Sequence, residues 1–174
     1  MKNNNRKRNP GFTLLELTVA TAILAMLSTA SMVLVRTSYT AWNRHEDDHA
    51  QRQECIAMLR HIVRQVRQAK AVLAISAAAD NSGSLSLLTT DGKVLVWEHD
   101  AAAKEVRYGI TTATNVLAQG IEELNFVGVK VDGVQQTTEV GLIHLVQCTA
   151  KFNLVRPAGN TLVTMSCRAW LRAW

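Results

Sequence analysis

The most obvious candidate for chemistry is a pair of histidines four residues apart with an adjacent glutamate, in the segment His45-Glu46-Asp47-Asp48-His49. On a helix, the two histidines would share one face and could bind Zn²⁺, while Glu46 would act as a general base. A zinc enzyme needs a third protein ligand, and there is no Asp or Glu from Cys55 to Ala79. The longer zinc motif would need glycine and histidine where Arg52 and Cys55 stand. We therefore expect a charged, solvated segment with no catalytic residue and no metal, and keep a membrane-tethered zinc hydrolase as the rival hypothesis.

Cys148 and Cys167 are the second candidate pair. If residues 157–160 (Pro-Ala-Gly-Asn) turn a hairpin, the two cysteines lie nearly opposite each other on adjacent antiparallel strands. An oxidising compartment would then permit a disulfide, although directly cross-strand bridges are geometrically awkward and free buried cysteines are common. Cys148–Cys167 is thus a candidate disulfide, with two packed thiols as the alternative, and Cys55 is expected to be a lone thiol.

Cofactor and nucleic-acid motifs are absent from the sequence. The nine glycines never form a phosphate loop or a dinucleotide-binding fingerprint, and no calcium-loop pattern occurs. The net charge of +5 and pI near 9.4 invite a nucleic-acid interpretation. However, four of the cations (Lys2, Arg6, Lys7 and Arg8) lie in residues 1–11, which leaves 15 basic against 14 acidic residues in the remainder. We therefore expect neither a cofactor nor a nucleic-acid partner.

A long apolar segment follows those four cations. Residues 12–35 have Glu16 as their only ionisable side chain, and as a helix these 24 residues would measure about 36 Å, enough to cross a membrane. Positive charge before the segment and Arg36 alone just after it place the N-terminus in the cytoplasm. The segment is too long for a conventional signal peptide. A carboxylate within a membrane span is costly without a partner, so Glu16 is a candidate functional residue; in a generic anchored binding module it would be incidental.

Periodicity predicts the remaining architecture. Apolar residues recur every three or four positions as far as Ile75, which predicts a helix over 36–75, and the arginines between them fall on its solvated side. Strand patterns follow over 84–90, 93–97, 104–110, 121–131, 140–155 and 161–171, with Asp91-Gly92 turning the first hairpin. The sequence therefore predicts an α+β fold in which a long N-terminal helix packs on an antiparallel sheet.

The N-terminal motif Gly11-Phe12-Thr13-Leu14-Leu15-Glu16-Leu17, with basic residues before it and an apolar helix after it, resembles the class III leader of type IV pilins and type II secretion pseudopilins. The resemblance implies cleavage by prepilin peptidase between Gly11 and Phe12, followed by N-methylation of Phe12. It also implies that Glu16 pairs with the N-terminal amine of a neighbouring subunit during assembly. The long helix and sheet are likewise the pilin-like architecture.

The order of strands, above all residues 117–126 (Leu-Ala-Gln-Gly-Ile-Glu-Glu-Leu-Asn-Phe), is similar to the J-type minor pseudopilins of type II secretion. Related minor pilins of type IV pili share much of this order, and Val127-Gly128-Val129 departs from the aromatic-rich stretch expected there.

These resemblances imply a leader over 1–11, a transmembrane helix over 12–35 and a periplasmic domain over 36–174, with a helix over 36–75 and a β-sheet head over 84–171. They imply a non-enzymatic subunit of the inner membrane and a pseudopilus or pilus. Its partners would be prepilin peptidase, the membrane and other pilin-like subunits.

Overall fold

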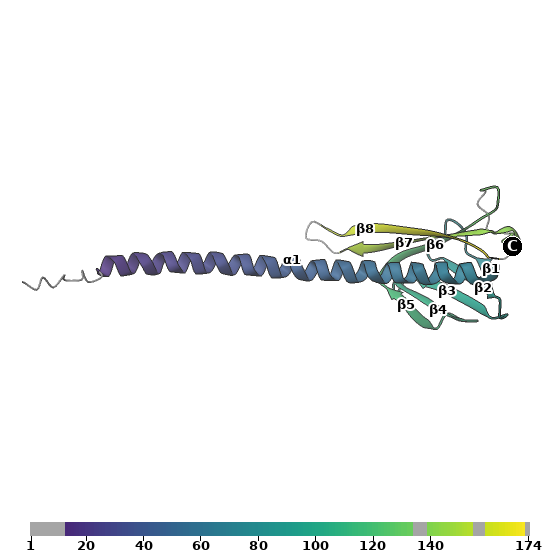
Figure 1. Cartoon of the computed structure of the whole chain (residues 1–174), viewed down its shortest axis with the longest axis horizontal. Coiled ribbons are helices and arrows are strands. Elements are labelled where there is room, and N and C mark those ends of the chain that lie inside the picture. Colours follow the sequence, from purple (N-terminus) through teal and green to yellow (C-terminus); the bar gives the residue numbers. More distant parts are fainter. Residues whose placement is uncertain (1–12, 134–138, 155–158, 173–174) are drawn as a thin grey trace, which may run out of the picture. The chain divides into compact units, whose positions relative to one another are not determined.

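The computed structural model describes residues 13–133, 139–154 and 159–172. The chain divides into two compact units, Met1–His45 and Glu46–Trp174. In the first unit the described residues belong to the start of helix α1, which runs over Leu14–Gln68 (Figure 1). The second unit contains the end of that helix and all eight strands.

Helix α1 ends at Gln68, so the expectation of a helix to residue 75 is wrong. Ala69–Ile75 form strand β1, which pairs antiparallel with β2, Ser84–Thr89, and has two register shifts. The segment has three Ala, one Lys and one Leu among its seven residues, and these types favour a helix by propensity alone. Pairing with β2 and burial of Ala69 and Val72 outweigh that local preference.

The strands form two antiparallel sheets, whereas the sequence predicts a single sheet. The first sheet has the order β1-β2-β3-β4-β5 and continues after β2 with β3 (Val94–Asp100), β4 (Glu105–Ile110) and β5 (Asn115–Gln119). The second has the order β6-β7-β8, with β6 at Ile121–Val129, β7 at Leu145–Leu154 and β8 at Thr161–Trp170. A short 3₁₀ helix, η1 (Val140–Leu142), precedes β7. The α+β class and the pilin-like packing of a long N-terminal helix on antiparallel strands are confirmed.

The expected hairpin at Asp91-Gly92 is present between β2 and β3. Gly92 has a φ of 77°, in the left-handed region that suits glycine, and its N–H donates to Thr89 O at 3.1 Å. Strand β5, which was not expected, pairs with β4 at the edge of the first sheet. The expected turn at residues 157–160 lies largely outside the described residues.

One core joins the end of α1 to both sheets, whose strands lie on either side of the helix in Figure 1. The helix contributes five buried residues, Cys55, Met58, Leu59, Ile62 and Val66. The largest buried side chains of the strands are Trp97 on the first sheet and Phe126 and Phe152 on the second. The period of the helix residues is the one expected from the sequence.

Two polar contacts fix α1 to the turn between β5 and β6. The side-chain amide of Gln51 donates to Gly120 O at 3.1 Å, and Glu54 accepts the N–H of Gln119 at 2.7 Å. Gly120 has a φ of 68°, and a Cβ at that position would contact the Gln51 amide. The helix thereby sets the corner at which the chain passes from one sheet to the other.

Candidate functional site

The first turn of α1 holds Glu16, and the structure gives it a local role that sequence reasoning missed. The Thr13 N–H and hydroxyl both lie 3.4 Å from Glu16 Oε2, and the Glu16 N–H donates to Thr13 Oγ1 at 3.3 Å. This reciprocal arrangement is a capping box, in which the first and fourth residues satisfy each other's free backbone donors. Its signal, Thr-x-x-Glu ahead of an apolar run, is present in the sequence.

Both contacts to the carboxylate use Oε2. Among the described residues, no hydrogen bond to Glu16 Oε1 is present. A carboxylate has room for several donors. Glu16 can therefore cap its own helix and still accept a further donor, such as a charged amine.

The apolar stretch after the capping box is exposed along its whole circumference. All described residues from 13 to 47 are exposed, including large apolar side chains such as Leu15, Leu24 and Leu34. The helix is long and apolar enough to cross a membrane. A helix that is apolar on every side is stable in lipid or among other apolar helices, because exposure of so large an apolar surface to water is unfavourable.

Hydroxyl groups within this stretch bond to the helix itself. The side chains of Thr18, Thr21 and Thr29 donate to the carbonyl three residues earlier, at 2.8–2.9 Å, and Ser28 donates to Leu24 O at 2.8 Å. These hydroxyls are thereby satisfied without water. Glu16 is the only ionisable side chain of residues 12–35, and within the described residues its Oε1 accepts no hydrogen bond.

The predicted processing site lies outside the described residues. Gly11 and Phe12, the residues expected to flank the cleaved bond, belong to the part of the chain for which the structure gives no placement. Their roles in cleavage and N-methylation stay predictions from the sequence.

The segment His45–His49 lies on α1, as the zinc hypothesis required, but at its surface. Four of its five side chains are exposed, and Asp48 is half-buried. Within residues 13–133, 139–154 and 159–172, no group of three His, Cys, Asp or Glu side chains could hold a metal ion. The described structure therefore supplies no third ligand for the histidines.

The predicted pairing of Cys148 and Cys167 is present as strand register: the two residues are direct antiparallel partners on β7 and β8. All three cysteines are free thiols in this structure. The Cys148 thiol is buried and hydrogen-bonds to Cys167, which raises the pKa of Cys148 and lowers the pKa of Cys167. Burial raises the pKa of Cys55 to about 11, with Cys167 contributing. Cys55 is a free thiol, as expected, and lies buried in the same core cluster as Cys148, with Cys167 packed against that cluster.

Comparison with known proteins matches only the N-terminal segment. A family model described as the prokaryotic N-terminal methylation motif matches residues 6–32, which include the capping box and the apolar stretch. No curated protein matches the chain. No solved structure matches it either. The motif and the exposed apolar helix together support a type IV pilin-like leader on a membrane-anchored, single-pass protein of the pilin and pseudopilin class.

Proposed function

We propose that this chain is a structural subunit of a type II secretion system, a minor pseudopilin that prepilin peptidase processes and that assembles into a periplasmic pseudopilus. The observation that carries the proposal is the coincidence, at residues 6–32, of a methylation motif with a capped helix that is apolar on every side. The packing of a long N-terminal helix on antiparallel strands, which is pilin-like, agrees with such a subunit.

Processing would remove residues 1–11 and expose the Phe12 amine for methylation. Gly11 has no side chain to obstruct a peptidase. Cleavage ahead of the apolar helix leaves the anchor in the mature protein. Four cations before the helix and Arg36 after it favour a cytoplasmic N-terminus and a periplasmic head.

Assembly would bring the Phe12 amine of one subunit to Glu16 of a neighbour. In an apolar surrounding an unpaired carboxylate and an unpaired amine are both costly, and pairing them reduces that cost. The unused Glu16 Oε1 supports this role, because the carboxylate can accept the amine without giving up the capping box. One charged pair in an otherwise apolar helix surface also fixes the register between neighbouring helices.

The strand order of the head favours the J-type minor pseudopilins. A minor pilin of a type IV pilus is the second candidate, because minor pilins share the leader and much of this strand order with the J-type proteins. Neighbouring genes for secretion components or for pilus components would distinguish the two systems.

Processing is tested by expressing the full chain with a prepilin peptidase and determining its N-terminus by mass spectrometry. We expect loss of residues 1–11 and a gain of one methyl group on Phe12. The Gly11→Val variant, which places a branched side chain at the cleaved bond, should stay intact, as should the native chain with a catalytically inactive peptidase. An intact native chain beside the active peptidase would refute the proposal.

The rival hydrolase is tested separately by metal analysis. Stoichiometric zinc that copurifies with the full chain and is lost in a His45→Ala/His49→Ala variant would favour the hydrolase. Zinc-free protein with unchanged processing would leave the structural role as the better account.

A further inference from the structure

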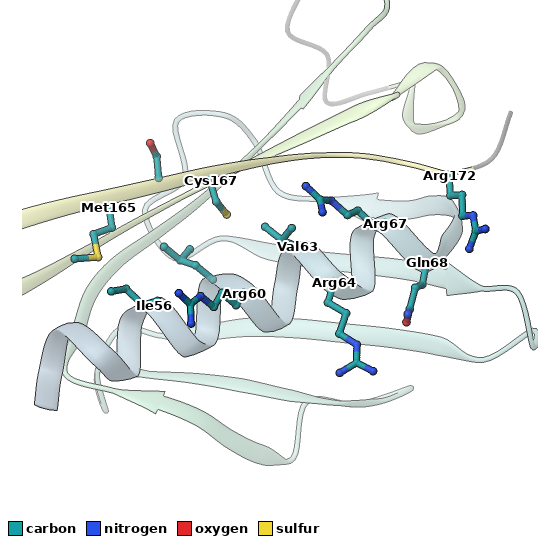
Figure 2. A pocket seen from close by; sticks show the side chains of 11 residues that line it. Ile56, Arg60, Val63, Arg64, Arg67, Gln68, Met165, Cys167 and Arg172 are labelled. Atoms are coloured by element: carbon teal, nitrogen blue, oxygen red, sulfur yellow. The ribbon is translucent and has the colours of Figure 1, made fainter.

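An open cavity of about 820 Å³ lies between the end of α1 and strand β8 (Figure 2). Apolar side chains of the helix, Ile56, Leu59 and Val63, line it together with Met165 of β8. A smaller cavity of about 470 Å³ shares Gln68 and Arg172 with it. The two cavities adjoin at these residues, and we call them together the α1–β8 groove.

The rim of the α1–β8 groove is strongly basic. Arg60, Arg64 and Arg67 of α1 and Arg172 beyond β8 line the larger cavity, and no acidic side chain lines it among the described residues. Within the described parts of the chain, none of these four guanidinium groups forms an ion pair. The smaller cavity adds Lys70. The groove thus presents an uncompensated positive charge beside an apolar floor.

The groove also runs along an open strand edge. Strand β8 is the last strand of the order β6-β7-β8, so one of its edges has no strand partner in the described structure. Three consecutive residues of β8, Met165, Ser166 and Cys167, line the cavity. Because successive side chains of a strand point to opposite faces, this lining places the cavity along the edge of β8. Figure 2 shows Cys167 pointing from β8 toward α1, with Arg67 on the facing side of the helix.

We propose that the α1–β8 groove binds an extended acidic segment of a partner polypeptide, which adds to the open edge of β8 as a further strand. Backbone groups of the segment would pair with β8, its carboxylates would contact the arginines, and its alternate apolar side chains would cover the floor. A phosphatidylglycerol molecule would use the arginines and cover the apolar floor with its acyl chains, but it would leave the backbone groups at the edge of β8 unpaired. The polypeptide therefore satisfies all three features of the groove.

This proposal concerns the head alone and does not depend on processing or filament assembly. Its probe is a fluorescent heptapeptide of alternating glutamate and valine, added to the full chain in zwitterionic detergent micelles with a phosphine reductant. Binding is measured by fluorescence anisotropy. Because each arginine would contribute a charge-assisted contact, we expect Arg67→Gln to weaken binding roughly fivefold. The control Lys93→Gln removes an exposed cation from the β2–β3 turn, outside the groove, and should change binding less than about twofold.

A second measurement reports on the place of binding. Cys167 is half-buried and lines the groove, whereas Cys55 and Cys148 are buried. The bound peptide should slow alkylation of Cys167 by iodoacetamide several-fold in the native chain, as read by peptide mass spectrometry.

Two peptide controls test the strand addition. A polyglutamate heptapeptide lacks side chains for the floor, and a peptide with alternate backbone nitrogens methylated lacks donors for β8, so both should bind at least about tenfold more weakly. Equal binding of either control, or unprotected Cys167, would overturn the proposal. Displacement of the peptide by phosphatidylglycerol, with polyglutamate binding equally well, would instead assign the groove to anionic lipid.

Discussion

Substituting glutamine for Glu16 separates the helix-capping role that the structure shows from the pairing role that we propose. Glutamine at the third helical position can complete a capping box, so Glu16→Gln should leave the start of α1 intact while removing the negative charge. Thr13→Ala makes the converse change, because it removes the hydroxyl of the capping box and leaves the charge in place.

The two changes should have very different costs. Thr13→Ala removes the two contacts of the Thr13 hydroxyl, which are 3.3–3.4 Å long and exposed, so it should cost about 0.5–1 kcal/mol. Removal of one partner from a buried ion pair costs about 3–5 kcal/mol, because the other charge is left unpaired. Since about 1.4 kcal/mol is a factor of ten, Glu16→Gln should reduce incorporation into a filament about a hundredfold or more.

The assay is competitive incorporation. Wild-type and variant chains are expressed together with the filament's other subunits, filaments are separated from membranes, and each chain is quantified in both fractions by mass spectrometry. We expect Glu16→Gln to remain in the membrane fraction after normal cleavage, and Thr13→Ala to enter filaments within about fivefold of wild type. Incorporation of Glu16→Gln at the wild-type level would refute the ion pair, and a defect confined to Thr13→Ala would assign Glu16 to helix capping alone.

Three further predictions concern the head. Oxidation should join Cys148 to Cys167, and closing a loop of about 20 residues should raise the free energy of unfolding by at most about 3 kcal/mol, as measured by denaturant titration. Gly120→Ala should cost about 1–3 kcal/mol, because it places a Cβ at a φ of 68° and displaces the Gln51 amide, and thermal unfolding would measure this. Burial, and secondarily Arg64, lowers the pKa of His61, so the unfolded state takes up a proton more readily and stability should fall as the pH drops below 6.5.

Each of these predictions has its own control. Cys148→Ala should abolish the gain from oxidation, and a gain that persists would point to a different bridge. Gly92 also has a left-handed backbone, but a Cβ added there would have no neighbour within 4 Å, so Gly92→Ala should reduce the free energy of unfolding less than Gly120→Ala. Equal reductions would show that contact with Gln51 contributes nothing to the cost of Gly120→Ala. His61→Gln should reduce the loss of stability below pH 6.5. If the variant loses as much stability as the native chain, the loss comes from other titratable groups.

The fold class and most strands could be predicted from the sequence because each depends on local pattern. The apolar period at Leu59, Ile62 and Val66 and the Asp91-Gly92 turn have the same meaning in isolation as in the folded chain. The end of α1 could not be predicted, since Ala69–Ile75 become a strand only through pairing with β2. The division into two sheets depends on the bend at Gly120, which contacts with α1 hold in place.

The candidate sites divide in the same way. The capping box is a local pattern, Thr13 with Glu16, and its signal is visible in the sequence. The opposition of Cys148 and Cys167 follows from hairpin register and was predicted, but the approach of Cys55 depends on packing between helix and sheet. The α1–β8 groove joins residues about a hundred positions apart and has no sequence signal at all.

The hydroxyl groups of α1 that bond to the helix itself affect how readily the helix can pass between lipid and a bundle of other helices. Because Thr18, Thr21, Ser28 and Thr29 donate to their own helix, these hydroxyls neither gain nor lose hydrogen bonds when lipid around them is exchanged for other helices. The transfer of the apolar stretch between a bilayer and a bundle of neighbours is then close to balanced in energy, apart from the charge at Glu16. In the proposed filament, such a subunit would be able to return to the membrane and be used again, with the charge of Glu16 deciding the direction.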